Sequence, residues 1–326
     1  MLKDLEATMG KTANAVKSFS QLPMDALIAS TKKLPEKNRL FAALYLLAVQ
    51  AYRRGRRVDA RGYLPYEQDL YIVPKLSDNR REYDHHTLPV PPKHLWLNYG
   101  ITANDYLSLG EAHVNTMISM ANSSGFSFRE GNRVLDFGCA AGRMIRWLDK
   151  VAAQCEIWGL DINARCIKWC QQNLSPPFKF ATITTTPHLP FEDRYFDFIY
   201  CGSVFSHIDD LADAWLLELK RITAPGGRIF ITVHDKHTAD LVMNHTEECR
   251  NYAHRIDWFR ALLMSYDKKA NFAKSDYGMF SIYTGGPQSQ VFYDIDFLHR
   301  HWELILDVLS VTPEAHGYQT AILLKK

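Results

Sequence analysis

The alternation of short apolar runs with helical stretches after residue 132 is the feature that most restricts the fold of this 326-residue chain. Such runs occur at Val134–Phe137, Ile157–Leu160, Phe196–Tyr200 and Arg228–Val233. Strands that alternate with helices form a mainly parallel sheet covered on both faces. Residues 304–311 and 319–324 follow one another closely, which predicts a terminal antiparallel pair. We therefore predict an α/β fold.

Two regions precede this alternating part. Apolar residues between Pro23 and Arg54 recur at intervals of three and four, so we expect an N-terminal helical cap at residues 1–60. Prolines accumulate over residues 61–100 and disfavour both helix and central strand, which predicts an extended linker or strap.

The main domain is expected to span residues 101–326. It begins with helical spacing over Thr102–Ser123, for which Thr102 or Asn104 is a suitable cap. The stretch from about 239 to 294 is rich in aromatic residues and too long for a simple crossover. We interpret it as a lid inserted over the carboxyl edge of the sheet, where open α/β sheets bind ligands, with ordinary core as the alternative.

Composition and charge exclude several classes of protein. Lys and Arg number 38 against 36 Asp and Glu, a net charge of +2, so nucleic acid is not an expected partner. The N-terminus carries acids where a signal peptide is basic, and the longest apolar run, residues 40–51, is shorter than the roughly 20 residues that span a bilayer. The six cysteines lack CxxC spacing. We expect a cytoplasmic protein without a membrane segment, a disulfide framework or a zinc site.

The most informative motif runs from Val134 to Met144, a strand followed by a turn of small residues and then an expected helix at Met144–Val151. Small residues let the backbone approach a ligand closely, and a helix N-terminus offers free N–H groups to an anion. Asp161 ends the next strand, where a carboxylate can accept both ribose hydroxyls of a nucleoside. The G-x-G-x-x-G spacing of dinucleotide-binding proteins is absent.

These residues resemble the class I S-adenosylmethionine-dependent methyltransferases, whose first motif reads acid-x-Gly-x-Gly-x-Gly. Asp136, Gly138 and Gly142 match it, and Ala140 replaces the middle glycine. The likeness continues in order through four further segments: Trp158–Ile162, Leu189–Asp197, Ser203–His207 and Leu219–Arg228. It implies a Rossmann-like seven-stranded sheet with an antiparallel last strand, with S-adenosylmethionine as cofactor.

Within this family the chain looks most like the branch that acts on small molecules or sugars, whose ending is similar to Ala315–Leu324. The resemblance implies a set of cofactor-binding residues: Asp136, Gly138, Cys139, Ala140, Gly142, Arg143, Asp161, Ile162 and Ser203. For Arg143 two interpretations stand side by side, contact with the cofactor's carboxylate and exposure to solvent. Threonines 184–186 stand where relatives often carry an acid for the adenine amine.

Two histidines are candidates for proton transfer. His207 follows the fourth strand and His234 ends the fifth, so both are expected at the ligand edge, with a packed or capping role as the alternative for His207. Other histidines fall in pairs at 85–86, 234–237 and 299–301, but no cysteine or carboxylate accompanies them at a recognised ligand spacing, and we expect no metal.

The function that follows is methyl transfer from S-adenosylmethionine to an oxygen or nitrogen of a small-molecule or sugar acceptor. Three alternatives remain open: a non-catalytic cofactor-binding module that acts on a partner, a protein methyltransferase, and a nicotinamide-dependent dehydrogenase. No expectation follows for the oligomeric state.

Overall fold

The computed structural model describes residues 88–209, 211–244, 259–260, 263, 278–282 and 289–326. All of them belong to the second of two units, Leu64–Lys326. The expected helical cap, residues 61–87 of the expected strap and most of the expected lid lie outside the described residues. In the part that is described, no helix combines the length and the apolar character needed to cross a membrane.

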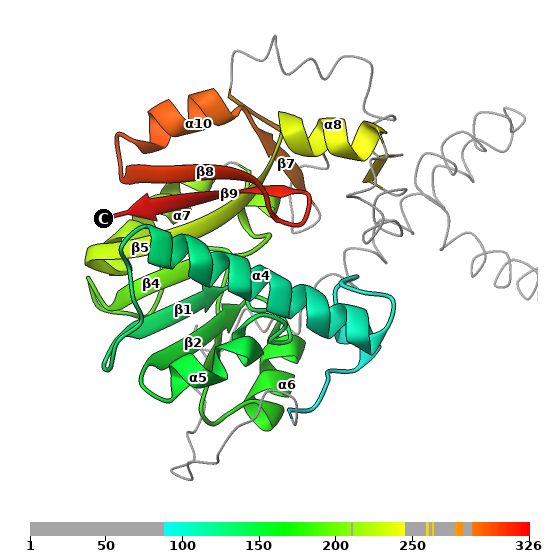
Figure 1. Ribbon diagram of the computed structural model, residues 1–326, viewed down its shortest axis with the longest axis vertical. Coiled ribbons are helices and arrows are strands. Elements are labelled where there is room, and N and C mark those ends of the chain that lie inside the picture. Colours follow the sequence, from blue (N-terminus) through cyan, green and yellow to red (C-terminus); the bar gives the residue numbers. More distant parts are fainter. Residues whose placement is uncertain (1–87, 210, 245–258, 261–262, 264–277, 283–288) are drawn as a thin grey trace, which may run out of the picture. The chain divides into compact units, whose positions relative to one another are not determined.

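The described elements alternate along the chain as predicted (Figure 1). They are η2 (Lys93–Leu95), α4 (Ala103–Ser123), β1 (Arg133–Phe137), η3 (Ile145–Leu148), α5 (Asp149–Ala152), β2 (Glu156–Asp161), α6 (Ala164–Asn173), β3 (Lys179–Thr182), β4 (Phe196–Cys201), η4 (Phe205–His207), α7 (Ala212–Ile222), β5 (Thr223–Asp235), α8 (Lys236–Asn244), β6 (Met279–Ile282), β7 (Gln290–Tyr293), α10 (Ile295–Trp302), β8 (Asp307–His316) and β9 (Gln319–Lys325).

One nine-stranded sheet organises these elements. Strands β1, β2, β3, β4 and β5 pair in parallel, in the spatial order β3-β2-β1-β4-β5. Strand β9 then pairs with β5 in antiparallel orientation, and β8 pairs with β9 at the edge. The predicted α/β fold, a Rossmann-like sheet whose last strand is antiparallel, is confirmed. All five parallel strands therefore end at one edge, where ligands bind in such sheets.

A second hairpin extends this sheet beyond the seven strands expected. Strands β6 and β7 are antiparallel, and β7 pairs in parallel with the last two residues of β5. Gln290–Tyr293 lie within the stretch that we interpreted as a lid, so this part of it belongs to the sheet. The hairpin therefore lies beside the carboxyl end of β5.

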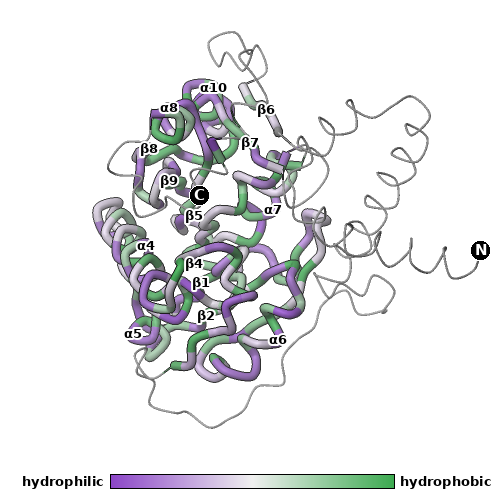
Figure 2. The backbone as a smooth tube through the Cα atoms, turned by 90° about the vertical axis from the view of Figure 1, so that its right-hand side faces the viewer, coloured by the Kyte–Doolittle hydropathy of each residue, from purple (hydrophilic) through white to green (hydrophobic). Residues whose placement is uncertain are grey.

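Two apolar clusters, one on each face of the sheet, form most of the core. One lies mainly between the sheet and α7 and α10, and the other packs α4, η3 and α6 onto the opposite face. Figure 2 shows α4 and α5 on one side of the central strands and α7 on the other. Because both faces are covered, the strands consist of almost continuous buried residues, as their sequences predicted.

Helix α4 fixes the first of these layers. Thr102 caps it: its hydroxyl accepts from the Asp105 N–H at 3.2 Å, and the Asp105 carboxylate accepts from the Thr102 N–H at 2.8 Å. This reciprocal pair satisfies two N–H groups that a helix start leaves open. The buried face carries Tyr106, Gly110 and His113 at helical spacing, so α4 brings two aromatic side chains toward the turn after β1.

The predicted helix at Met144–Val151 was wrong in type. The segment forms a 3-10 turn, Ile145–Leu148, followed by a single α-helical turn. The Trp147 N–H donates to the Met144 carbonyl, three residues back, at 3.0 Å. Ile145, Arg146 and Leu148 are all buried, so tertiary contacts on several sides, and not a one-sided apolar stripe, set this backbone. The free helix N-terminus expected for an anion is therefore not provided here.

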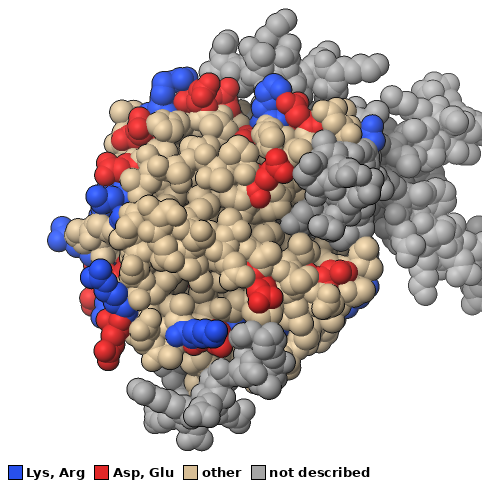
Figure 3. All heavy atoms as spheres, viewed as in Figure 1, with Lys and Arg blue, Asp and Glu red and all other residues tan. Residues whose placement is uncertain are grey.

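Charges on the face that Figure 3 shows lie mainly around its margin, with basic and acidic side chains of the described residues interspersed. The solvent side of α4 crosses this face, and most of its exposed residues are small or uncharged polar ones. The described residues on this face therefore create no electrostatic potential of predominantly one sign.

Candidate functional site

The turn after β1 has the backbone geometry that its small residues predicted. Gly138, Ala140 and Gly142 have φ values of 89°, 47° and 77°. The N–H groups of Gly138 and of the next residue donate to the Leu160 carbonyl at 2.7 and 3.0 Å, which ties the turn to the end of β2. A Cβ at Gly138 would collide with the Val204 side chain. Only glycine satisfies both the positive φ and the close approach at this position.

Asp161 lies directly beside this turn. Its Oδ2 accepts from the Ala140 N–H at 2.8 Å, and its Oδ1 accepts from the Asn163 N–H at 2.7 Å. Only 9% of the residue is exposed. Burial raises the pKa of this carboxyl, while the backbone N–H groups, including that of Ile162, act against the rise. Asp161 is also close enough to Asp136 for its charge to raise the pKa of that carboxyl, and the neighbouring Ile162 is half-buried.

Asp136 is the more perturbed of the two acids. Burial raises its pKa to about 8, although the nearby Tyr200 hydroxyl and Arg143 guanidinium oppose the rise. Its Oδ2 and the Tyr200 hydroxyl are both buried; the hydroxyl lies close enough to lower the pKa of the carboxyl, yet neither atom makes a well-formed hydrogen bond within the described part of the chain. Unpaired buried polar atoms cost free energy unless a ligand satisfies them, which marks this spot as part of a binding site.

Arg143 does not face solvent, because it is only 5% exposed. Its guanidinium carbon lies 3.9 Å from the ring centroid of Tyr99, and its Nη1 lies 3.0 Å from Nδ1 of His113. Nη2 lies 3.5 Å from Nε2 of His316. No carboxylate of the described residues comes within 4.0 Å of the guanidinium. A buried cation without such a carboxylate favours an anionic group of a ligand.

The two imidazoles beside Arg143 come from distant parts of the chain. His113 lies on α4 and His316 ends β8, yet their ring centroids are 3.7 Å apart. His316 also lies over Gly202, where an added Cβ would meet its ring at 3.0 Å. The cluster therefore stands at the carboxyl edge of β4, next to the turn that follows β1.

The described end of the expected strap packs onto the same turn. Arg146 donates from Nη2 to the Leu88 carbonyl at 2.6 Å and from Nη1 to the Pro89 carbonyl at 3.1 Å. Leu95 packs against Ala141 in a small buried cluster. Tyr99, at the end of this segment, supplies the ring beside Arg143. Residues 88–100 therefore cover the outer side of the turn.

The cysteine expected at the cofactor is buried and protonated. Burial raises the pKa of the Cys139 thiol well above its ordinary value, and the same holds for Cys170. Both thiols lie near one carbonyl, that of Ala140, at 3.6 and 3.5 Å. They fill space beneath the turn and carry no nucleophilic character there.

Ser203 and His207 lie on the segment that follows β4. Ser203 has a φ of 58°, and its N–H donates to the Thr232 hydroxyl at 2.7 Å. Nδ1 of His207 lies 2.7 Å from the Ser289 carbonyl and is therefore the nitrogen that carries a proton. His207 is half-buried beside the start of β7, so the structure ties it to the second hairpin.

His234 lies in a packed aromatic surrounding. It is 1% exposed, and its ring centroid is 5.0 Å from that of Phe259, 5.3 Å from Phe292 and 5.8 Å from Tyr318. Its Nε2 lies 2.9 Å from the side-chain nitrogen of Gln319. The structure thus brings His234 to the carboxyl edge, as expected, within the cluster that α8 and the second hairpin form.

Of the paired histidines, several take part in hydrogen bonds. His237 contacts Glu314 at 2.7 Å and His301 contacts Asp213 at 2.8 Å. No group of three or more metal-ligating side chains occurs among the residues that the structure describes. His85 and His86 lie outside that part of the chain.

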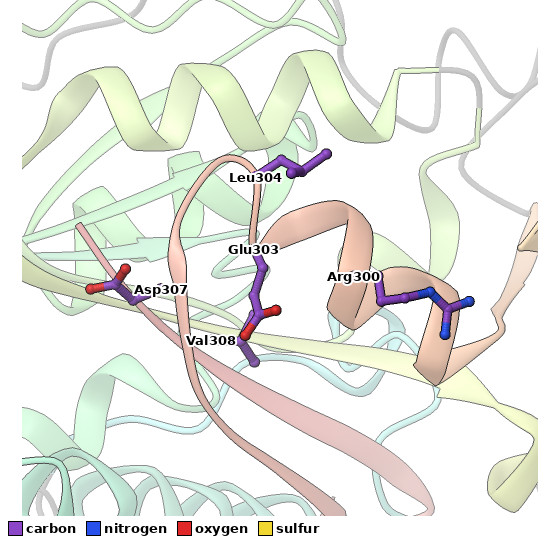
Figure 4. A pocket seen from close by; sticks show the side chains of 5 residues that line it. All are labelled: Arg300, Glu303, Leu304, Asp307 and Val308. Atoms are coloured by element: carbon purple, nitrogen blue, oxygen red, sulfur yellow. The ribbon is translucent and has the colours of Figure 1, made fainter.

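A shallow hollow elsewhere in the fold plays no part in this arrangement (Figure 4). It is lined by Arg300, Glu303, Leu304, Asp307 and Val308, around the end of α10 and the start of β8. Asp307 pairs with Lys325, whereas His316 pairs with Gln319 at the opposite end of the same strand. The hollow therefore lies at the amino edge of the sheet, away from Asp136 and Arg143.

Sequence reasoning missed several residues of this site. Tyr99, His113 and Tyr200 were assigned no role, and His316 and Gln319 were noted only as part of the chain's ending. His113 shares helical spacing with core residues, so its pattern resembles that of any packed side chain. The signal that could have identified Tyr200 is its position two residues before Gly202 at the end of a buried strand.

Comparison with known proteins agrees with this geometry. A family model described as a methyltransferase domain matches residues 120–274, just under half of the chain. The matched residues contain the turn after β1, Asp161 and Ser203.

Two curated relatives illustrate the similarity. A probable phthiotriol/phenolphthiotriol dimycocerosates methyltransferase 2 of Mycobacterium ulcerans (strain Agy99) is 31% identical over 115 residues, which are 35% of this chain and 43% of that protein. The ubiquinone/menaquinone biosynthesis C-methyltransferase UbiE of Burkholderia cenocepacia (strain HI2424) is 27% identical over 142 residues, 43% of this chain and 56% of that protein. The chain thus spans about half the length of these relatives.

Two solved structures of methyltransferases align with much of the chain, each with a TM-score below 0.5. The magnesium protoporphyrin IX methyltransferase of Synechocystis PCC 6803 with bound SAH has a TM-score of 0.44 and 14% identity, covering 70% of this chain and 91% of that one. A SAM-dependent methyltransferase of Aquifex aeolicus has a TM-score of 0.39 and 14% identity, covering 66% of this chain and 97% of that one.

Proposed function

We propose that this chain is a class I S-adenosylmethionine-dependent methyltransferase that transfers a methyl group from that cofactor to a small-molecule acceptor, a proposal that its similarity to a methyltransferase domain model and to curated methyltransferases supports. One observation carries the proposal: the carboxylate of Asp161 lies 2.8 Å from the Ala140 N–H, in the middle of the glycine turn. If the ribose of the cofactor binds that carboxylate, the rest of the cofactor lies against the turn.

Asp161 fits the ribose. The N–H groups of Ala140 and Asn163 use two of its carboxylate lone-pair positions, the Ile162 N–H interacts with it as well, and an ionised carboxylate offers about four positions. The remaining positions can accept ribose hydroxyls as charge-assisted hydrogen bonds. The backbone bonds hold the carboxylate in place before the cofactor binds, so little ordering cost remains.

The methionine end of the cofactor is a zwitterion, and the site offers a buried cation and a buried carboxyl, which the ammonium of the cofactor would favour in its ionised form. Arg143 is a buried cation suited to the carboxylate, and Asp136 has an unpaired buried oxygen suited to the ammonium. The two groups are close enough for the Arg143 charge to lower the pKa of Asp136. The residues present therefore fit this cofactor, because its ammonium would satisfy the buried Asp136 oxygen that lacks a hydrogen bond among the described residues.

When bound, the cofactor supplies an electrophilic methyl group, so the protein's part is to hold the acceptor in line and exclude water. Residues 88–100 cover the turn on its outer side and contribute to that exclusion. An acceptor hydroxyl must also lose a proton. His207 is suited to take it at Nε2, because its Nδ1 is engaged by the Ser289 carbonyl.

The sequence pattern favours an oxygen or a nitrogen of a small molecule or sugar as the acceptor atom. The UbiE relative is named a C-methyltransferase, which adds an activated carbon to the acceptors worth testing. A non-catalytic cofactor-binding module and a protein methyltransferase are the alternatives.

Calorimetry with S-adenosylhomocysteine tests the proposal. Asp161→Ala is expected to weaken binding by about 1–3 kcal/mol through lost charge-assisted hydrogen bonds. Asp161→Asn keeps one acceptor oxygen and should lose less. Asp193→Ala is the control, because Asp193 is an exposed acid that pairs with Arg221. Unchanged affinity in a folded Asp161→Ala protein contradicts the ribose assignment, and transfer of labelled methyl groups to a set of small acceptors separates an enzyme from a binding module.

A further inference from the structure

The turn between β8 and β9 supplies three side chains to the carboxyl edge of the sheet. His316 lies 3.5 Å from Arg143, and the ring of Tyr318 lies 5.8 Å from that of His234. Gln319 lies 2.9 Å from the same histidine. This turn therefore joins the Arg143 cluster to the aromatic surrounding of His234.

Gln319 is the central member of a buried chain of hydrogen bonds. The Ser203 N–H donates to the Thr232 hydroxyl at 2.7 Å. The Thr232 hydroxyl donates to Oε1 of Gln319 at 2.6 Å, and Nε2 of Gln319 lies 2.9 Å from Nε2 of His234. Thr232 is 0%, Gln319 3% and His234 1% exposed, so this series of hydrogen bonds runs through the protein interior. It crosses three neighbouring strands, from the end of β4 through β5 to β9.

The direction of these hydrogen bonds follows from the Gln319 oxygen, which lies beside the Thr232 hydroxyl. The hydroxyl accepts from the Ser203 N–H and donates its own hydrogen to Oε1 of Gln319. Gln319 then presents its oxygen to Thr232 and its NH2 group to His234. Nε2 of His234 must accept that hydrogen bond, and the proton of the neutral ring is left on Nδ1.

We propose that Gln319 is a positioning residue, which fixes His234 as the Nδ1–H tautomer and, through Thr232, holds the turn at Ser203. Ser203 has a φ of 58°, a conformation that a serine keeps only where its surroundings hold it. Gln319 acts on the cofactor through this turn, so its role depends on the proposed function and on Ser203 bordering the cofactor. The Nε2 of His234 is then occupied and takes no proton from an acceptor, which leaves His207 as the base.

The tautomer can be measured in the full chain without any enzyme assay. Long-range proton–nitrogen NMR spectra, with His234 assigned from the signals lost in His234→Asn, are expected to show a protonated Nδ1 and an unprotonated Nε2. In Gln319→Glu a carboxylate replaces the NH2 donor, so Nε2 should become protonated. A wild-type ring protonated at Nε2, or a Gln319→Glu ring that keeps the wild-type pattern, overturns the proposal.

Cofactor affinity tests the other half. Gln319→Leu should weaken S-adenosylhomocysteine binding by about 3- to 10-fold, the range for the one lost hydrogen bond that supports the turn at Ser203. Thr320→Val is the matched control: its hydroxyl bonds Asp235 at 2.6 Å, equally buried but outside the chain. We expect the control to bind within about twofold of wild type. Equal weakening in both variants, or none in Gln319→Leu, overturns the proposal. A wild-type protein that binds no S-adenosylhomocysteine refutes the proposed function, and the tautomer measurement then decides the Gln319 assignment by itself.

Discussion

Replacing Asp136 with asparagine is expected to stabilise the cofactor-free protein relative to wild type, increasingly so as the pH rises from 5 to 8. The carboxyl has a pKa of about 8 in the folded protein against an ordinary value of 3.8, because burial disfavours its charged form. Below about pH 4 the carboxyl is protonated in both the folded and the unfolded protein, so its ionisation does not change the free energy of unfolding. As the pH rises toward 8, the unfolded chain ionises this group while the folded protein keeps it protonated, so the free energy of unfolding falls.

The magnitude follows from that difference. Each pH unit between about 4 and 8 removes up to about 1.4 kcal/mol, a total of roughly 5–6 kcal/mol if the full difference is realised. Relaxation around a buried charge reduces such values, so we expect about 2–4 kcal/mol between pH 5 and 8. Asparagine keeps the shape of the side chain and cannot ionise, so its contribution should be flat over this range.

Urea unfolding followed by tryptophan fluorescence between pH 5 and 8 gives the measurement. The difference in free energy of unfolding between Asp136→Asn and wild type should grow with pH, by about 1 kcal/mol per unit. Saturating S-adenosylhomocysteine should reduce that growth, because its ammonium favours the ionised carboxylate. Parallel stability curves for the two proteins would refute the assignment of Asp136 as a buried, protonated acid in the free protein.

Two further substitutions test the turn and the buried cation. Gly138→Ala should lower the free energy of unfolding by about 2–4 kcal/mol, from positive φ and the collision with Val204. Gly131→Ala has a similar φ of 83° and open space around its Cβ, so its cost should be only about 1–2 kcal/mol, and equal losses would exclude the collision. Arg143→Met should weaken S-adenosylhomocysteine binding roughly 10- to 100-fold by calorimetry. Arg129→Met is the control, because Arg129 is exposed, and it should not change the affinity. Unchanged affinity in the Arg143→Met protein would show that Arg143 does not contact the cofactor.

Much of the fold could be predicted because its signals are local. The strand, the turn of small residues and the next strand lie within 30 residues, and the acids at 136 and 161 mark the ends of neighbouring strands. Parallel pairing then brings such strand ends to one edge without further information. The same holds for the capping box at Thr102, whose two partners are three residues apart. What failed was the helix at 144–151, whose backbone depends on contacts from several sides.

The sequence by itself determined the α/β class, the antiparallel closing pair, and the place of Asp136 and Asp161 beside the glycine turn. These features could be predicted because periodicity and strand ends depend on residues that are close together in the sequence. Only the tertiary structure decided what surrounds Arg143 and His234. His316 lies 173 residues from Arg143 and Gln319 lies 85 residues from His234, and each pair meets through the packing of whole elements. Local pattern cannot distinguish a histidine that packs in a core from one that holds a buried cation, because both occupy the same apolar face and differ only in what lies opposite.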